Sequence, residues 1–276
     1  MSPDEPERGI VNRVAVVTGA ARGIGAATVL ALAARGWSVL AVDSVADDPA
    51  LPYPMATPDD LAGLVRRAAR AGARPGQVRS LVADVRDGAA LAAAVAEAER
   101  RWGGLDAAIA VAGVIAGGVP LWEVPLAQQQ AVLDIDLGGV LTLARAAVPA
   151  LLRRPAPRSG RFLAVASAAA SRGLPMLAAY CAAKAGVAGL IRALAAELAD
   201  SGVTANAVSP GSTATPILDE SARLYGLPGA DSFARQQPAG RLLDPAEVAA
   251  VLAFLAGPGS SGMTGAVVPV DGGLAL

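Results

Sequence analysis

Short apolar runs rich in β-branched residues alternate along this chain with longer alanine-rich segments. Seven runs have the length and composition of β-strands: Arg13–Thr18, Trp37–Asp43, Val78–Ala83, Leu105–Val111, Arg161–Ala166, Val203–Val208 and Ala266–Val270. Five segments between them have the length of helices: Gly23–Arg35, Asp87–Trp102, Leu126–Arg153, Leu177–Asp200 and Pro245–Ala256. The predicted strands are almost continuously apolar, as expected for a parallel sheet that helices cover on both faces. The pattern predicts a single doubly wound α/β domain over residues 1–276, with a seven-stranded, mostly parallel sheet.

Two segments interrupt this alternation. Residues 44–76 hold a proline-rich loop and then a predicted helix, Pro58–Ala71, which Thr57 is placed to cap. Residues 212–240 form a loop-rich segment with a short helical piece. Long segments that follow the carboxyl ends of strands often serve as lids or binding loops. We therefore expect an insertion at about 44–76 and a substrate loop at about 212–240.

The composition excludes several classes of protein. Hydrophobic residues make up 54% of the chain and charged residues 17%, which excludes a largely disordered protein. The formal net charge is −1, so a nucleic-acid partner held by a basic surface is not expected. The chain has no histidine, which excludes Ser-His-Asp and Cys-His catalysis and any metal site with histidine ligands. Its one cysteine, Cys181, excludes an intrachain disulfide and a multi-cysteine cluster, so no metal site is predicted.

Neither the start of the chain nor its longest uncharged stretch has the pattern of an export or membrane segment. Met1–Asn12 is acidic and lacks the basic flank and apolar core of a signal peptide. The stretch Val248–Val270 carries no charge, but glycine and proline break it, which predicts helix, turn and strand rather than a membrane span. We therefore expect a cytoplasmic protein with no membrane partner.

The turn after the first predicted strand carries Gly19, Gly23 and Gly25, with Arg22 and Ile24 beside them. A glycine-rich turn that opens a helix lets backbone approach a pyrophosphate, and the free N–H groups and positive dipole end of the helix face the phosphates. A glycine-rich turn without a ligand is the alternative. The strand before the turn and the helix after it favour a dinucleotide site.

Asp43 ends the second predicted strand. A carboxylate there can accept both hydroxyls of an adenosine ribose and repels a 2′-phosphate, which favours NAD over NADP. Arg22 could instead favour NADP, but Ser44 offers no cation beside Asp43, so NAD is the predicted cofactor. A solvated aspartate at a strand end is the alternative interpretation. Asp84, which ends the third strand, is placed to contact the adenine edge.

Tyr180 and Lys184 lie four positions apart in a predicted helix, so they share one face. Lys184 is the one lysine among 23 basic residues. A phenol must have a pKa about 3 below its usual value of about 10 to act as a base near neutrality, and an ammonium one turn away supplies part of that change. Ser167 ends the preceding strand and can hydrogen-bond a substrate oxygen. Each residue alone is more often packing or solvated, but their joint spacing indicates a Ser–Tyr–Lys proton-transfer site.

These motifs together resemble those of the short-chain dehydrogenase/reductase family, which are NAD(P)-dependent oxidoreductases on a seven-stranded Rossmann domain. The resemblance rests on TGAARGIG at Thr18–Gly25, Asp43, Asp84–Val85, Ser167, YCAAK at Tyr180–Lys184, and Pro210–Gly211. It implies Tyr180 as the general acid/base, Ser167 as the residue that orients the reacting oxygen, and Lys184 as the group that holds the nicotinamide ribose and lowers the tyrosine pKa. It also implies a cofactor site made of Gly19, Arg22, Gly23, Ile24, Gly25, Asp43, Ser44, Asp84, Val85, Ala112, Gly113, Tyr180, Lys184, Pro210, Gly211, Thr213 and Thr215.

The chain departs from the family pattern at two places. The residues Ala110-Val111-Ala112-Gly113 stand where the family usually has Asn-Asn-Ala-Gly, so packing beside the cofactor is expected to differ. Asp136 stands where a helix asparagine completes a proton relay with the lysine, and we count it among the predicted catalytic residues. An aspartate can accept a hydrogen bond from Lys184, but its charge would raise the pKa of Tyr180. We expect a working relay with a higher pH optimum.

The segment after Asp43 resembles one particular group within the family. Residues 53–61, YPMATPDDL, are similar to an insertion found in mycofactocin-associated members of the family. In that group the insertion lies over the adenine side of NAD, NAD is held too tightly to exchange freely, and electrons leave through the redox carrier mycofactocin. The resemblance therefore implies NAD that is recycled in place, with mycofactocin as electron acceptor. A longer surface loop is the alternative.

Three mostly apolar segments are expected to wall the substrate site: Val114–Pro120, Ala168–Leu174 and Ser212–Gly240. They favour a small hydrophobic secondary alcohol or its ketone over a sugar phosphate or an organic acid. The predicted helices Leu126–Arg153 and Leu177–Asp200 are apolar on more than one face, which predicts self-association. The resemblance implies a homotetramer formed through these helices.

The sequence is compatible with two functions from different classes. The first is an NAD-dependent oxidoreductase, which the retention of Ser167, Tyr180 and Lys184 favours. The alternative is a catalytically degraded dinucleotide-binding sensor or scaffold on the same fold. Asp136 and the absent asparagines motivate that alternative.

Overall fold

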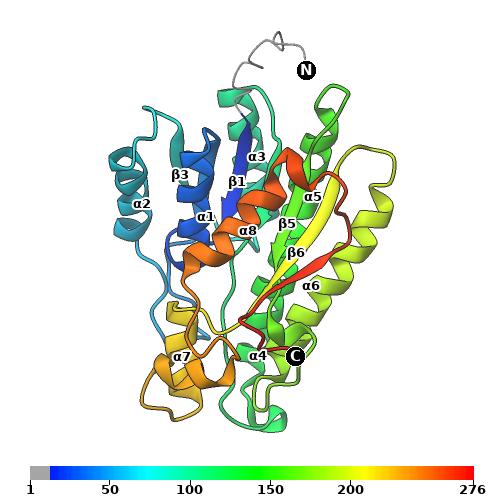
Figure 1. Ribbon diagram of the computed structural model, residues 1–276. Helices are drawn as coiled ribbons and strands as arrows, with labels where there is room; N and C mark the ends of the chain where they lie inside the picture. Colours follow the sequence, from blue (N-terminus) through cyan, green and yellow to red (C-terminus); the bar gives the residue numbers. More distant parts are fainter. Residues whose placement is uncertain (1–12) are drawn as a thin grey trace.

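The computed structural model describes residues 13–276 and unites seven strands in one sheet (Figure 1). The strands are β1 (Val14–Thr18), β2 (Ser38–Asp43), β3 (Val78–Val82), β4 (Ala107–Ala110), β5 (Arg161–Val165), β6 (Thr204–Pro210) and β7 (Val267–Val270). Their order is β3-β2-β1-β4-β5-β6-β7, and all neighbouring pairs are parallel. The predicted doubly wound α/β fold is confirmed. The prediction made for Met1–Asn12 lies outside the described residues.

Helices cover both faces of this sheet. They are α1 (Gly23–Ala34), α2 (Pro58–Arg70), α3 (Gly88–Trp102), α4 (Leu126–Leu133), α5 (Gly139–Arg153), α6 (Ala178–Glu197), α7 (Pro216–Leu224) and α8 (Pro245–Ala256). One apolar core joins α1, α2 and α8 to the sheet, and a second joins α3, α4, α5 and α6 to the opposite face. Figure 1 shows α7 outside both layers, at the end of the molecule where the chain also terminates.

Local signals in the sequence set the starts of several helices. At α2, Thr57 Oγ1 accepts from the Asp60 N–H at 3.2 Å, and Asp60 Oδ2 accepts from the Thr57 N–H at 2.8 Å. The carboxylates of Asp87 and Asp244 cap α3 and α8. Such caps satisfy N–H groups that have no partner within the helix, and each contributes about 1 kcal/mol. The cap predicted at Thr57 is confirmed.

The edge strand β3 departs from the predicted burial. The strand β1 is buried throughout, but Arg79, Ser80 and Val82 of β3 are exposed, Val82 at 61%. β3 has a strand neighbour on one side only, and the helices cover the edge of a sheet less completely than its centre. The expectation that every strand is covered on both faces is therefore wrong for β3.

The segment 126–153, predicted as one helix, is divided in two. α4 ends at Leu133, α5 begins at Gly139, and Asp134–Gly138 between them forms a π-helical turn. A π turn accommodates one extra residue and so changes the direction in which the following side chains point. Asp136 lies in this turn and is completely buried. The apolar pattern continues across the turn, which is why hydrophobic periodicity did not reveal it.

The two irregular segments follow the carboxyl ends of β2 and β6. α2 is an ordinary crossover helix between the parallel strands β2 and β3, so the additional chain is residues 44–57 rather than the whole of 44–76. We call residues 44–57 the insertion. The second segment, 212–240, contains α7 and a 3₁₀ helix, η4 (Ala230–Gln236).

Two helical stretches, 126–153 and 178–197, are long and apolar enough to cross a membrane by length and composition alone. Core helices of globular proteins have the same length and composition. Both stretches belong to the layer that packs on the sheet, and half and one third of their most apolar windows are buried. We interpret them as core helices that retain some exposed apolar surface.

Candidate active site

A cavity of about 620 Å³ lies at the carboxyl ends of the strands. Its lining contains every residue predicted to hold the cofactor: Gly19, Arg22, Gly23, Ile24, Gly25, Asp43, Ser44, Asp84, Val85, Ala112, Gly113, Tyr180, Lys184, Pro210, Gly211, Thr213 and Thr215. Ser167 lines the cavity as well, whereas Asp136 lies behind its wall. One cavity therefore brings together the glycine-rich turn and the Ser–Tyr–Lys group.

The turn from β1 to α1 closes against backbone, which is why it needs glycine. Gly19 has a φ of +62°, and a Cβ on it would lie 2.5 Å from the Ala112 backbone. A Cβ on Gly25 would lie 1.9 Å from the Gly19 carbonyl oxygen. No side chain caps the start of α1, so its first N–H groups are left for a ligand. This cradle of small residues and free N–H groups fits the pyrophosphate of a dinucleotide.

Two backbone N–H groups hold the Asp43 carboxylate at the end of β2. The Ala21 N–H donates to Oδ2 at 3.0 Å and the Val45 N–H donates to Oδ1 at 3.1 Å. A carboxylate has about four acceptor positions, so both oxygens can still accept from a ribose. The Arg22 guanidinium, the competing cation, donates through both Nη atoms to the Pro54 carbonyl oxygen at 3.2 Å. The charge beside the predicted ribose position is therefore negative.

Asp84 lines the cavity, but its carboxylate is engaged by Arg86, a residue that the sequence analysis did not single out. Arg86 Nε lies 3.0 Å from both Asp84 oxygens, and Arg86 Nη1 lies 2.7 Å from Asp48 Oδ2 in the insertion. Burial would raise the pKa of Asp84, but the hydrogen bonds from Arg86 hold it below its ordinary value. Arg86 thus joins the end of β3 to the insertion.

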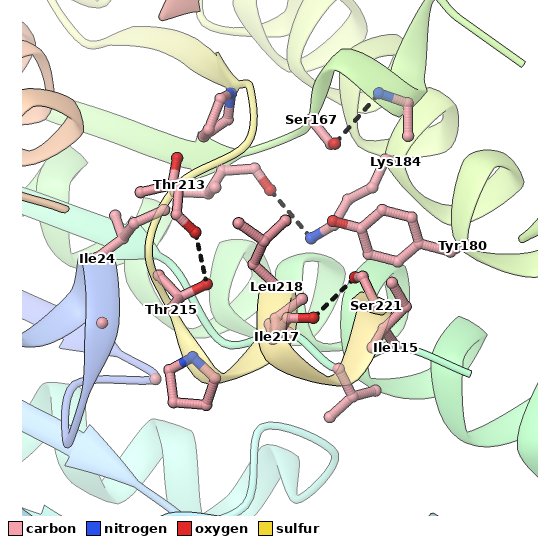
Figure 2. A pocket seen from close by; sticks show the side chains of 18 of the residues that line it. Ile24, Ile115, Ser167, Tyr180, Lys184, Thr213, Thr215, Ile217, Leu218 and Ser221 are labelled. Carbon is pink, nitrogen blue, oxygen red and sulfur yellow. Dashed lines mark hydrogen bonds between the residues drawn. The ribbon is translucent and has the colours of Figure 1, made fainter. Parts of the chain in front are cut away.

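The three residues of the Ser–Tyr–Lys group meet on one wall. Tyr180 and Lys184 lie one turn apart on α6, and the ammonium is 5.6 Å from the centre of the tyrosine ring. Ser167 follows β5, and its hydroxyl accepts from the Ala169 N–H at 3.1 Å at the start of the 3₁₀ helix η3 (Ala168–Ala170). Figure 2 shows Ser167, Tyr180 and Lys184 around the pocket, with Ile217 and Leu218 of α7 facing them.

Asp136 lies directly behind this group. Its Oδ2 lies 3.1 Å from Lys184 Nζ, and the Val114 N–H donates to its Oδ1 at 2.8 Å. Lys184 Nζ also donates to the Val165 carbonyl oxygen at 3.2 Å. The lysine, 4% exposed, is therefore held between a carboxylate and a carbonyl group. The contact expected between Asp136 and Lys184 is present as a buried ion pair.

Burial and this ion pair shift three pKa values. Burial raises the pKa of Asp136 above its ordinary value, and Lys184 offsets part of the rise. Burial would lower the pKa of Lys184, but the charges of Asp136 and Tyr180 raise it, so the lysine stays an ammonium. Burial raises the pKa of Tyr180, Lys184 and Ser167 oppose the rise, and Asp136 adds to it. The protein alone therefore keeps Tyr180 protonated at neutral pH.

Thr18 hydrogen-bonds the backbone of Ala110–Gly113, the stretch where the family resemblance implies two asparagines. The Val111 N–H donates to Thr18 Oγ1 at 3.3 Å across the neighbouring strand ends of β1 and β4. Gly113 lies close to the ion pair, since a Cβ on it would stand 3.3 Å from Lys184 Nζ. The chain thus keeps a compact, polar connection at this point without a side-chain amide.

The cavity has two parts that differ in chemistry. We call the glycine-rich turn, the ends of β2 and β3 and the insertion residues Asp48 and Met55 the dinucleotide half. The substrate half is lined by Ile115, Ser167, Arg172, Leu174, Tyr180, Ile217, Leu218, Ser221, Tyr225, Leu227, Phe233 and Leu274. Of the predicted wall Val114–Pro120, only Val114 and Ile115 line the cavity. Leu274 was not predicted, because nothing in its local sequence indicates that the chain end returns to the site.

Comparison with known proteins agrees with this geometry. A family model described as enoyl-(acyl carrier protein) reductase matches residues 19–275. Cis-4-hydroxycyclohexanecarboxylate dehydrogenase of Sinomonas cyclohexanicum is 42% identical over 95% of this chain and 96% of its own. The structure of carveol dehydrogenase from Mycobacterium avium in complex with NAD matches with a TM-score of 0.88 and 33% identity, covering 95% of this chain and 97% of that one. The structure of an actinorhodin polyketide ketoreductase with NADPH matches with a TM-score of 0.85 and 30% identity, covering 96% and 98%.

The chain therefore belongs to the short-chain dehydrogenase/reductase family. Within that family it is an NAD(P)-dependent dehydrogenase or reductase that acts on alcohols or ketones. Both NAD and NADPH occur in the matching solved structures, so the choice between them depends on residues of this chain.

Proposed function

We propose that this chain is an NAD-dependent oxidoreductase that interconverts a hydrophobic secondary alcohol and its ketone, with Tyr180 as general acid/base. The observation that carries the proposal is the buried Lys184 ammonium one helical turn from Tyr180, in a cavity that also contains Ser167 and the glycine-rich turn. When bound, NAD supplies the acceptor or donor of the hydride. The residues of the chain hold the reactants and move the proton.

The proton step follows from the positions of three side chains. The hydroxyl groups of Ser167 and Tyr180 both reach the cavity and can hydrogen-bond the oxygen of the substrate. In alcohol oxidation the Tyr180 phenolate accepts the hydroxyl proton, and in ketone reduction the phenol returns it. Lys184 favours the phenolate, and its contacts with Asp136 and Val165 keep the ammonium in position. The positive charge of an oxidised nicotinamide would lower the pKa of Tyr180 further.

The preference for NAD rests on Asp43. Its carboxylate lines the dinucleotide half, and its orientation is fixed by the Ala21 and Val45 N–H groups. A ribose 2′-phosphate beside it would be repelled, whereas a free 2′-hydroxyl would be accepted. Arg22 is directed to Pro54 instead of to that position.

We also propose that the insertion retains NAD, with mycofactocin as the external electron acceptor. Three sets of contacts support the retention: Arg86 binds Asp48 at 2.7 Å, Arg22 binds the Pro54 carbonyl oxygen, and Tyr53 Oη accepts from the Ile115 N–H at 2.9 Å. Asp48 is 8% exposed, so its pair with Arg86 is shielded from solvent on one side. These contacts attach the insertion to the start of α1, the end of β3 and the wall of the substrate half.

The variant Asp48→Asn tests this retention. It removes the carboxylate in the insertion that Arg86 binds and leaves its pair with Asp84. We expect bound NAD to exchange about tenfold faster with labelled NAD, measured on the protein as purified. Asp59→Asn, on the exposed first turn of α2, is the matched control. Purified protein without cofactor absorbance that turns over added NAD at ordinary rates would contradict the retention.

The substrate class and the assembly are proposed from the same surfaces. A cis-4-hydroxycyclohexanecarboxylate dehydrogenase and a carveol dehydrogenase among the similar proteins, together with the apolar substrate half, support a ring-bearing secondary alcohol. Trp122, Leu126 and Leu141 are exposed by 84%, 77% and 48% at and near α4 and α5, and one third of the most apolar window of α6 is buried. This exposed apolar surface supports a homotetramer formed through α4, α5 and α6. A monomer at micromolar concentration in sedimentation would contradict it.

Tyr180→Phe separates an enzyme from a sensor or scaffold. We expect this variant to bind NAD as the parent protein does but to lose alcohol-dependent cofactor reduction by about a thousandfold. Tyr225→Phe is the control for removing a hydroxyl from the same cavity. Tyr225 lines the substrate half, but its hydroxyl donates to the Pro175 carbonyl oxygen and faces no ammonium, so the variant should act on KM and not on kcat. If both variants reduce the cofactor equally well, the assignment of Tyr180 is wrong.

A further inference from the structure

The substrate half contains one charged side chain that no other charge neutralises. The charged residues that line the whole cavity are Arg22, Asp43, Asp48, Asp84, Arg86, Arg172 and Lys184. Arg86 is paired with Asp48 and Asp84, and Lys184 is paired with Asp136. Arg22 and Asp43 belong to the dinucleotide half. Arg172 alone stands among the apolar walls of the substrate half, and within residues 13–276 it forms no ion pair.

Arg172 is held in position by the backbone on both sides. Its N–H donates to the Ala168 carbonyl oxygen at 3.0 Å, which continues the short helical turn that begins at Ser167. Its Nη1 donates to the Leu274 carbonyl oxygen at 2.6 Å. The guanidinium is therefore anchored on the segment that carries the Ser167 hydroxyl, and its position relative to that hydroxyl is limited.

The contact with Leu274 leaves free the edge of the guanidinium that a carboxylate would bind. A carboxylate binds a guanidinium best through two parallel hydrogen bonds, and the Nε and Nη2 hydrogens form one such edge. Nη1 alone is engaged by Leu274, and no hydrogen bond from Nε or Nη2 occurs within the described residues. The side chain is exposed at the cavity, so solvent occupies this edge until a ligand displaces it.

The rest of the substrate half limits which anion can bind there. Leu174, Ile217, Leu218, Leu227 and Phe233 are apolar. The hydroxyls of Ser221 and Tyr225 already donate to the carbonyl oxygens of Ile217 and Pro175, which leaves Gln236 as a side-chain amide on this wall. One guanidinium matches the single charge and planar shape of a carboxylate, whereas a phosphate dianion carries a second charge for which the substrate half has no further cation. The wall therefore fits a hydrocarbon body that carries one carboxylate away from the reacting oxygen.

We propose that Arg172 binds a carboxylate of the substrate, so that the preferred alcohol or ketone is a hydroxy or keto acid with a hydrocarbon body. This refines the proposed function and rests on it: Ser167 and Tyr180 hold the reacting oxygen, and Arg172 fixes the opposite end of the substrate. The mostly apolar sequence of the walls favoured an uncharged substrate. The predicted wall Ala168–Leu174 contains Arg172, but the sequence did not reveal that its guanidinium has no counter-ion there.

Kinetics on a matched pair of substrates test the proposal. The probes are cis-4-hydroxycyclohexanecarboxylate and its neutral methyl ester, and the readout is the ratio of their kcat/KM values. We expect the parent protein to prefer the carboxylate, and Arg172→Gln to lower the ratio by about tenfold to a hundredfold, mainly through KM for the carboxylate. The glutamine amide ends at the position of the arginine Nε and does not reach Leu274, so this variant removes that contact as well. Arg172→Lys, which keeps the charge but not the paired donors, should lie between the two.

The control is Arg235→Gln, on η4 and outside the cavity lining. It removes the same charge from the same region and should leave the ratio unchanged. A purely structural role for Arg172 would lower both kcat/KM values together and leave their ratio at the parent value, which would overturn the proposal. A parent protein that prefers the ester would overturn it as well, while leaving the proposed oxidoreductase function intact.

Equilibrium binding separates failure of the proposal from failure of the proposed function. We expect the NAD-bound protein to bind 4-oxocyclohexanecarboxylate at least about tenfold more tightly than 4-oxocyclohexanecarboxamide, and Arg172→Gln to remove that difference. This measurement needs no turnover. An Arg172-dependent difference without any catalysis would support the carboxylate site and contradict the enzyme assignment, whereas equal binding of the two probes would contradict the site.

Discussion

The two halves of the cavity are built in different ways. The dinucleotide half depends on backbone: a positive φ at Gly19, free N–H groups at the start of α1, and N–H groups that fix Asp43. The substrate half depends on side chains that arrive from η3, α6, α7 and the chain end. A backbone site tolerates little change in shape, while a side-chain site can change its ligand by single substitutions. This difference accounts for a common cofactor and varied substrates within one fold.

The halves also differ in how they keep their charges. In the dinucleotide half, Arg86 bridges Asp84 and Asp48 at a partly exposed position, and Asp43 faces the cavity. Behind the substrate half, Lys184 and Asp136 are both buried, so each depends on the other for neutralisation. Substitutions at the buried pair should therefore cost far more stability than substitutions at the exposed charges.

Lys184→Met should produce the largest loss. It leaves the Asp136 carboxyl buried without its cation, and breaking a buried pair from one side costs about 3–5 kcal/mol. We expect the free energy of unfolding at pH 8 to fall by about that amount, with loss of turnover. Urea unfolding of Lys184→Met and of the double variant Lys184→Met/Asp136→Asn measures the effect, because the double variant removes the unpaired charge and should recover most of the stability.

The cost of Lys184→Met should depend on pH. Burial raises the pKa of Asp136 above its value in the unfolded chain. The carboxyl is therefore neutral in both states at low pH, and the stability of the variant falls as the pH rises from the unfolded pKa to the folded one. The double variant should show no such dependence. A single variant as stable as the parent protein at pH 8 would show that the pair is not buried as described.

Gly19→Ala should give the next largest effect and breaks the dinucleotide half through its backbone. The new Cβ would meet the Ala112 backbone, and φ is positive, so we expect a loss of about 3 kcal/mol in unfolding free energy and weaker NAD binding. Gly240→Ala separates strain from collision, because Gly240 has a φ of +68° and nothing within 4 Å of a Cβ. It should lose only about 1 kcal/mol. Thermal and urea unfolding measure both variants. If Gly19→Ala and Gly240→Ala lose the same free energy of unfolding, the Cβ at position 19 does not collide with the Ala112 backbone.

Asp136→Asn should give the smallest effect on turnover and sharpens the comparison by changing one charge. Because it leaves the Lys184 ammonium buried without its carboxylate, it should also lower the free energy of unfolding. The amide oxygen can still accept from the Val114 N–H, but the negative charge that raises the pKa of Tyr180 is gone. The pKa of Tyr180 should therefore fall, and the acidic limb of the pH–rate profile for alcohol oxidation should move to lower pH. Asp134→Asn, in the same π turn, is the control. An unchanged pH–rate profile would show that Asp136 does not raise the pKa of Tyr180.

Much of this protein could be predicted from short patterns in the sequence. Apolar runs and alanine-rich segments determined the parallel α/β fold, because each element has its own period and length. The glycine-rich turn and the pair Tyr180 and Lys184 were also readable, since a turn and one helical face are local geometries. The boundaries at Thr57 and Pro58 followed from local hydrogen bonding.

Only the tertiary structure decided which remote groups meet. Arg86 joins the end of β3 to the insertion, and Leu274 holds Arg172 at the substrate half. The contact of Asp136 with Lys184 was expected from the family resemblance, but its complete burial in a π turn was not. Each of these contacts joins residues far apart in the chain, and its strength depends on distance and burial rather than on neighbouring sequence. A charge pattern along the chain cannot specify such partners, because packing determines which charges are brought within reach and shielded from water.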